Sequence, residues 1–277
     1  MGYFSLMVAA LLPAIVLCIY VFRKDRVDKE PITLLLRLFF LGAISCLPAV
    51  LLESFASGIV TAFFGDPEHL PKLLYYGYAA AENFLGIALI EEGCKWAMLL
   101  LATRNSKHFD SLFDGIVYAV FVSLGFAAFE NVGYAVSFGM STALVRAFTS
   151  IPGHMFFGVM MGYYYSWWHA HKKAQEYETH FHAIGLLGGT GTQFHPESLL
   201  FKSLAYPMLI HGLYDLTCTL QTVWSTLMFF AFLLVLYVHS FRTVRKMSAM
   251  DSKNFKIAFA LLEKAYPGLW AKTAPQL

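Results

Sequence analysis

The stretch 73–103 reads LLYYGYAAAENFLGIALIEEGCKWAMLLLAT and decides how the rest of the chain is interpreted. It is apolar over about 30 residues, which is long enough for one helix to cross a bilayer. Near its middle stand two carboxylates, Glu91 and Glu92, and one ammonium, Lys95. Each charge at the centre of a membrane helix costs roughly 2.5–3.5 kcal/mol on insertion scales. Ionisable residues at this depth therefore mark a candidate functional site.

The composition of the whole chain is that of a membrane protein. Of its 277 residues 58% are hydrophobic and 14% are charged, whereas soluble domains are about one-quarter charged. The formal net charge of +2 gives no reason to expect a nucleic-acid partner. The four cysteines form no CxxC pair and no disulfide framework.

Successive apolar segments predict an all-α, polytopic membrane helix bundle of about seven transmembrane helices. The expected spans are approximately 3–22, 33–64, 73–103, 113–138, 143–168, 199–219 and 223–241. Basic residues concentrate in the loops after the first, third, fifth and seventh spans. The positive-inside rule then predicts an N-terminus outside the cell, a cytoplasmic C-terminus and a multi-pass protein of the plasma membrane.

Two domains are expected from this pattern. Residues 1–247 form the transmembrane bundle, which holds an intramembrane active site, and residues 248–277 form a cytoplasmic tail. Apolar residues at helical spacing in the tail, Phe255, Ala258, Phe259 and Leu262, predict an amphipathic helix at the membrane surface. The longest polar segment, from His169 to about Glu197, is expected to be a cytoplasmic loop.

The glutamate pair contains more negative charge than its neighbour can neutralise. Lys95 lies four residues after Glu91 and three after Glu92, so on a helix it can reach either carboxylate. One carboxylate is then left over, and two carboxylates do not readily ionise together in a low dielectric. A left-over carboxylate suits a general base or acid. The simpler alternative is a structural ion pair between helices.

Four further polar residues occur inside the expected spans: Glu130, His154, His211 and Asp215. His211 and Asp215 are four residues apart, on one helix face. At about 1.5 Å per residue, Glu91, Glu130, His154 and His211 fall within roughly 8 Å of one depth. Taken singly, each can be a satisfied hydrogen-bonding residue. Together, on four different helices, they predict one site in the bundle interior.

These motifs, in this order, resemble those of the PrsW family of intramembrane proteases over about residues 25–245. The matching patterns are Glu91-Glu92-x-x-Lys95, FDGIVY at 113–118, Phe126-x-x-x-Glu130-Asn131, His154 and His211-x-x-x-Asp215. The family is similar in motif logic to the CAAX prenyl endopeptidases. The resemblance implies hydrolysis of a peptide bond in or near a transmembrane segment of a membrane-protein substrate, such as an anti-sigma-factor-like regulator. It implies a catalytic set of Glu91, Glu92, Lys95, Glu130, His154, His211 and Asp215.

Whether a metal takes part is left open at this stage. His154 and His211 with one carboxylate, for which Glu130 is the candidate, would make a three-ligand open zinc site. No HExxH helix is present, and a metal-free mechanism with histidines as oxyanion donors is equally compatible with these residues. The competing functions are an ion- or proton-coupled transporter that uses the same polar plane and a non-catalytic membrane receptor. Absence of an internal repeat disfavours the transporter. The expected partners are the substrate and the lipid bilayer, and the sequence predicts no oligomeric state.

Overall fold

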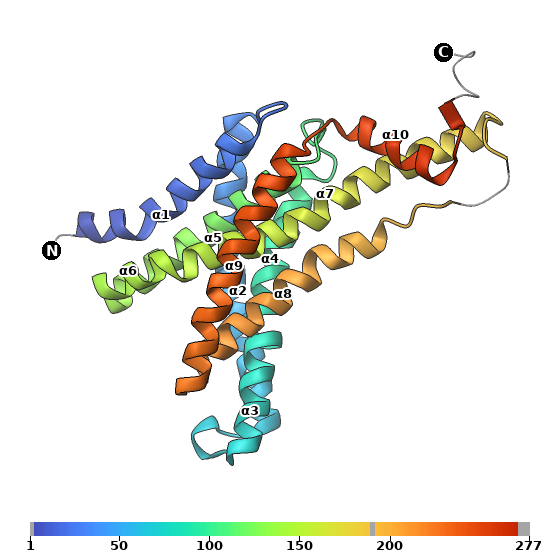
Figure 1. The fold of residues 1–277 in the computed structure, drawn as a ribbon. Coiled ribbons are helices and arrows are strands. Elements are labelled where there is room, and N and C mark those ends of the chain that lie inside the picture. Colours follow the sequence, from blue (N-terminus) through green and yellow to red (C-terminus); the bar gives the residue numbers. More distant parts are fainter. Residues whose placement is uncertain (1–2, 189–191, 271–277) are drawn as a thin grey trace.

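The computed structural model describes residues 3–188 and 192–270, and this part of the chain is helical without any β-strand. The predicted all-α architecture is therefore confirmed (Figure 1). The elements are α1 (Tyr3–Lys24), α2 (Ile32–Phe64), the short 3₁₀-helix η1 (Pro67–His69), α3 (Lys72–Ala81), the π-helix η2 (Glu82–Ala88), α4 (Leu89–Thr103), α5 (Asp114–Phe138), α6 (Met140–Phe148), α7 (Ser150–Ala183), α8 (Glu197–Thr219), α9 (Val223–Ala249) and α10 (Asn254–Ala265).

Four helical segments among the described residues are long and apolar enough to cross a membrane: Tyr3–Lys24, Ile32–His69, Asp114–Phe138 and Val223–Ala249. The other three expected spans coincide with helices that are shorter or more polar. These are the continuous run α3–η2–α4, the first part of α7, and α8. The count of seven spans and the orientation of the termini stay predictions.

Helix α5 forms the centre of the bundle and packs against α1, α2, α4 and α7. It is buried along most of its length. Glycines allow its neighbours to approach closely: a Cβ placed on Gly162 of α7 would lie 2.5 Å from the carbonyl oxygen of Gly115 in α5. On the same face of α7, a Cβ on Gly158 would lie 2.8 Å from the Ser123 hydroxyl. The two glycines thus act as a small-xxx-small pair between α5 and α7.

The polar segment after residue 168 is not the loop that the sequence suggested. Helix α7 continues to Ala183, and α10 lies along this extension (Figure 1). Ala258 and Leu262 of α10 are buried beside Ala174 of α7. The amphipathic pattern of the tail therefore forms a helix whose apolar side packs on the extension of α7. Binding of α10 to the membrane surface stays a prediction, and residues 271–277 of the predicted tail lie outside the described part.

The expected fifth span, 143–168, is also divided. Helix α6 ends at Phe148 and α7 begins at Ser150. Pro152 lies in the first turn of α7, where its missing N–H leaves no helix bond unmade. Arg146, in the last turn of α6, forms an ion pair with Glu130 of α5, as described below.

Three connections meet at the end of the bundle that carries α10. The backbone N–H of Phe113 donates to Asp251 Oδ1 at 2.9 Å, which joins the α4–α5 connection to the α9–α10 connection. Lys253 Nζ bonds Asp110 at 2.6 Å and Asp28 of the α1–α2 connection at 2.8 Å. Asp25 and Glu30, in that same connection, are buried.

Acidic pH is expected to stabilise this junction. Burial raises the pKa of Asp25 to about 6 and that of Glu30 to about 7. Nearby acidic groups add to both shifts: Asp251 raises the pKa of Asp25, and Asp25 raises that of Glu30. The unfolded chain ionises both groups near pH 4. Between about pH 4 and 7 the folded state therefore binds more protons, and stability falls as the pH rises through this window. The midpoint of thermal unfolding in detergent should decrease from pH 5 to pH 8.

The double variant Asp25→Asn/Glu30→Gln should make that midpoint less dependent on pH. Glu68→Gln is the control because Glu68 is an exposed carboxylate in η1, away from this junction. An unchanged slope in the double variant would show that other groups cause the pH dependence.

Candidate active site

The structure brings all seven predicted site residues together. They come from four helices: Glu91, Glu92 and Lys95 from α4, Glu130 from α5, His154 from α7, and His211 and Asp215 from α8. Each is joined to another member of the set by an ion pair or hydrogen bond. Contacts between α4 and α7, between α4 and α8, and between α5 and α7 hold the set together, so folding of the bundle is required to assemble it.

The side chain of Lys95 lies at the centre of this cluster and is fully buried. Its Nζ is 2.6 Å from Glu92 Oε1, 3.2 Å from Glu91 Oε2 and 3.1 Å from His154 Nδ1. The ammonium also lies 4.4 Å from the ring centroid of Phe126. Three acceptors and one aromatic face thus surround a cation that has no access to water.

The contact with Lys95 fixes the tautomer of His154. An ammonium can only donate, so Nδ1 of His154 must accept and Nε2 must carry the ring proton. Nε2 then donates to Glu130 Oε2 at 3.0 Å. Glu130 also forms an ion pair with Arg146 at 2.7 Å. Its carboxylate is therefore held by two donors, and it is not the isolated buried acid that the sequence alone suggested.

His211 connects the glutamate pair to Asp215. Its Nδ1 is 2.9 Å from Glu92 Oε1, and its Nε2 is 3.2 Å from Asp215 Oδ2 and 4.0 Å from Glu91 Oε2. The imidazole stacks on Phe157, with 4.5 Å between ring centroids. Carboxylates on both sides of the ring favour an imidazole that donates from either nitrogen.

A cavity of about 590 Å³ opens beside the cluster. Glu91, Glu130, His154, His211 and Asp215 line it, whereas Glu92 and Lys95 lie behind this layer and do not. Within the glutamate pair only Glu91 faces the cavity. Glu92 already accepts from both Lys95 and His211. The two neighbouring glutamates therefore have different surroundings.

Three cavity residues were missed by the sequence analysis. Arg146 pairs with Glu130, but an arginine near the end of a span is equally suited to lipid headgroups. Asn83 lies in the π-helix η2, and its side-chain Oδ1 accepts a hydrogen bond from the Thr219 hydroxyl of α8 at 3.0 Å. The extra residue of a π-helix turn is frequent at functional sites, although no sequence pattern announces it. Glu53 of α2 lines the cavity as well, and its charge inside an apolar helix was an available signal.

The donor atoms that are best placed for a metal are those of Glu91, Glu92 and His154. Among the described residues these three offer ligand atoms within 4.8 Å of one another. Two carboxylates and an imidazole are suitable zinc ligands. However, Lys95 Nζ contacts all three side chains. A cation in the same space would meet the ammonium, so the group does not fit a metal while Lys95 stays in place.

The chain matches the model of a protein family described as "PrsW family intramembrane metalloprotease" over residues 30–241. It is 30% identical over 245 residues to Protease PrsW of Geobacillus kaustophilus, which covers 88% of this chain and 92% of that protein. It is 30% identical over 248 residues to Protease PrsW of Bacillus subtilis, with 90% and 98% covered. The corresponding protein of Oceanobacillus iheyensis is 32% identical over 211 residues, with 76% and 81% covered.

No solved structure gives a significant match. The family match covers the glutamate pair, Glu130, both histidines and Asp215. The transporter interpretation is not favoured by these relatives, all of which are named as proteases. Together with the apolar helices that can span a membrane, the comparisons show that this chain belongs to the PrsW family of intramembrane metalloproteases and is a multi-pass membrane protease.

Proposed function

We propose that this protease hydrolyses a peptide bond in or near a transmembrane segment of a membrane-protein substrate, with Glu91 as the general base. The observation that carries the proposal is the position of Glu91. Of the two glutamates, Glu91 is the one that lines the cavity, and it shares the Lys95 ammonium with Glu92. A base must reach the attacking water, and Glu92 is turned away from the space where that water would lie.

The reaction follows from these positions. Glu91 takes a proton from a water molecule whose oxygen attacks the scissile carbonyl carbon. The resulting oxyanion accepts a hydrogen bond from His211 Nε2, which gives up its bond to Asp215 for this one and lies 4.0 Å from Glu91 Oε2. The carbon–nitrogen bond then breaks, and Glu91 gives its proton to the leaving amine. Glu92 and Asp215 hold the His211 ring between them.

The remaining residues of the set are assigned positioning roles. Lys95 pairs with both glutamates, neutralises one of the two charges and orients His154. His154 and Arg146 together hold Glu130 at the cavity wall. The position of Lys95 among the best-placed donors supports the metal-free alternative, so His211 is assigned as the oxyanion donor here.

The topology completes the proposal. An N-terminus outside the cell and α10 in the cytoplasm follow from the basic loops, and the chain then resides in the plasma membrane. The substrate class is a protein with a single transmembrane segment, such as an anti-sigma-factor-like regulator.

The test is cleavage of a co-expressed single-span reporter together with metal analysis of the purified protease. Wild type should cut the reporter, and His211→Ala should not, because the oxyanion loses its donor; one such donor is worth about 10²–10³ in kcat. Wild type should contain no stoichiometric zinc and should cut in the presence of a chelator.

Two outcomes would contradict parts of this proposal. If His211→Ala cuts the reporter at the wild-type rate, the assignment of the site is wrong. If wild type holds one zinc ion per chain, and both His154→Ala and His211→Ala lose it, the histidines are metal ligands. His195→Ala is the matched control, since His195 is exposed and precedes α8, outside the cluster.

A further inference from the structure

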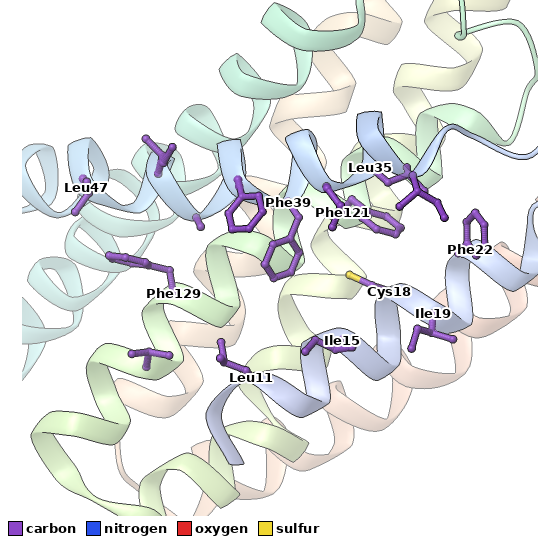
Figure 2. Close-up of a pocket in the computed structure, with 16 residues that line it drawn as sticks. Leu11, Ile15, Cys18, Ile19, Phe22, Leu35, Phe39, Leu47, Phe121 and Phe129 are labelled. Atoms are coloured by element: carbon purple, nitrogen blue, oxygen red, sulfur yellow. The ribbon is translucent and has the colours of Figure 1, made fainter. Parts of the chain in front are cut away.

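Helix α2 borders two hollows of different character. The first is a groove between α1 and α2, whose lining side chains, such as Phe39, are apolar throughout (Figure 2). Cys46 and Ala49 of α2 pack, buried, on Phe126 of α5 between this groove and the catalytic cavity. The second hollow is the catalytic cavity itself, and there the wall that α2 contributes carries a carboxylate, that of Glu53.

Glu53 lies deep in the membrane part of α2 and on the face that lines the cavity. Cys46, Val50 and Glu53 all line it, and their spacing of four and three residues puts them on one side of the helix. At about 1.5 Å per residue, Glu53 is about 16 Å along the helix axis from the end of α2 at Phe64. Its side chain is too short to reach lipid headgroups over that length. An ionisable residue at such a depth is a candidate functional residue.

Glu53 differs from the other carboxylates at the cavity because it has no partner. Each of the others pairs with a basic side chain: Glu91 with Lys95 at 3.2 Å, Glu130 with Arg146 at 2.7 Å, and Asp215 with His211 at 3.2 Å. Within residues 3–188 and 192–270, no ion pair or hydrogen bond joins the Glu53 side chain to another residue. The cavity wall therefore presents one carboxylate whose charge is not balanced by the protein.

The chemistry of the cavity indicates what would balance this charge. Arg146 lines the cavity, but it is held by Glu130, and its guanidinium lies 3.8 Å from the ring centroid of Tyr134. A metal ion needs several ligands, and Glu53 belongs to no group of possible metal ligands in the described part of the chain. The cavity must, however, admit the polypeptide that is cut beside Glu91. A basic side chain of that polypeptide would supply the missing cation.

We propose that Glu53 determines specificity by binding an arginine or lysine side chain of the substrate. The proposal rests on the proposed function, in which the scissile bond lies at Glu91. Both carboxylates line the same cavity of about 590 Å³, so the basic residue lies within a few residues of the bond that is cut. Arginine suits the site better than lysine, because a planar guanidinium donates two parallel hydrogen bonds to one carboxylate.

The first test is a series of single-span reporters that carry arginine, glutamine or glutamate at each position on either side of the scissile bond. At one of these positions, wild type should cut the arginine reporter with a kcat/KM about 10–100-fold above that of the glutamine reporter. This factor is the usual value of a hydrogen bond to a charged group. The glutamate reporter should be cut most slowly. Equal rates for the three residues at every position would overturn the role of Glu53.

The second test changes the charge of residue 53. Glu53→Gln should bring the ratio of kcat/KM for the arginine and glutamine reporters close to one. Glu53→Arg should reverse the preference, so that the glutamate reporter is cut best. Glu68→Gln is the control and should keep the wild-type ratio, because Glu68 is an exposed carboxylate in η1 and does not line the cavity. A ratio that Glu53→Gln leaves at its wild-type value, with all reporters slowed alike, would overturn the specificity role.

Thermal unfolding in detergent distinguishes specificity from a structural role. The midpoint of Glu53→Gln should be no lower than that of wild type, because the carboxylate has no partner to lose. A lower midpoint would identify Glu53 as a structural residue and overturn its role in specificity. A wild type that cuts every reporter at the same rate would overturn the specificity alone, whereas a wild type that cuts none would overturn the proposed function as well.

Discussion

Glu91→Gln is expected to reduce kcat for cleavage of the reporter by about 10²–10⁴-fold, which is the usual contribution of a general base. Glutamine keeps the size of the side chain and can still accept a hydrogen bond from Lys95, 3.2 Å away in the wild type. It cannot take a proton from water. The variant should therefore insert and accumulate like wild type, and its KM should change little. Cleavage of the co-expressed reporter and the yield of folded protease are the two measurements.

The comparison with Glu92→Gln decides which glutamate is the base. Glu92 accepts from Lys95 at 2.6 Å and from His211 at 2.9 Å, so its loss should disturb the position of His211 as well as the charge balance. We expect that variant to lose stability together with activity. Glu68→Gln, an exposed carboxylate in η1, is the control. If Glu91→Gln cuts normally while Glu92→Gln is inactive and fully folded, the roles are reversed.

Much of this site was visible in the sequence because the chain is otherwise so apolar. Glu91, Glu130, His154 and His211 stand out in their spans, and an estimate of depth was enough to place them in one plane. The structure agrees, since His154 and His211 have ring centroids 5.3 Å apart. The same reasoning could not assign partners. Which nitrogen of each imidazole meets which carboxylate depends on helix rotation, and periodicity fixes rotation only to within a face.

The fold was predictable to the same extent. Long apolar runs such as Asp114–Phe138 gave helices with nearly the expected bounds. The extension of α7 to Ala183 was missed because its residues are polar, and their helical order depends on α10, which packs against them from about 80 residues further along the chain. The π-helix η2 was missed because a wider turn is a matter of backbone packing and has no compositional signature. Long-range partners thus decide what local patterns leave open.

The cluster distributes its charges in a way that singles out Lys95. Arg146 forms an ion pair with Glu130 at the cavity, and Asp215 pairs with His211. Within the described part of the chain, the glutamate pair has only Lys95 as a permanent cation in contact, and that ammonium is shared between both carboxylates and His154. Removing it leaves two buried carboxylates without a counter-charge.

Lys95→Met is therefore expected to destabilise the protease by about 3–5 kcal/mol, the usual effect of removing one partner from a buried ion pair, and to abolish cleavage. Methionine retains much of the volume of the lysine stem, so the effect reports on charge more than on packing. The midpoint of thermal unfolding in detergent measures the first effect and the reporter assay measures the second.

The double variant Lys95→Met/Glu92→Gln separates the loss of folding from the loss of function. It removes one negative and one positive charge together, so its thermal midpoint should recover towards that of wild type, while cleavage stays absent because His211 loses its carboxylate partner and His154 loses its donor.

Zinc added to Lys95→Met meets three donors that the ammonium no longer occupies, and it should raise the thermal midpoint of this variant and leave that of wild type unchanged. A wild-type protein stabilised by zinc to the same degree would mean that Lys95 moves aside for the metal, and the metal-free mechanism would have to be abandoned.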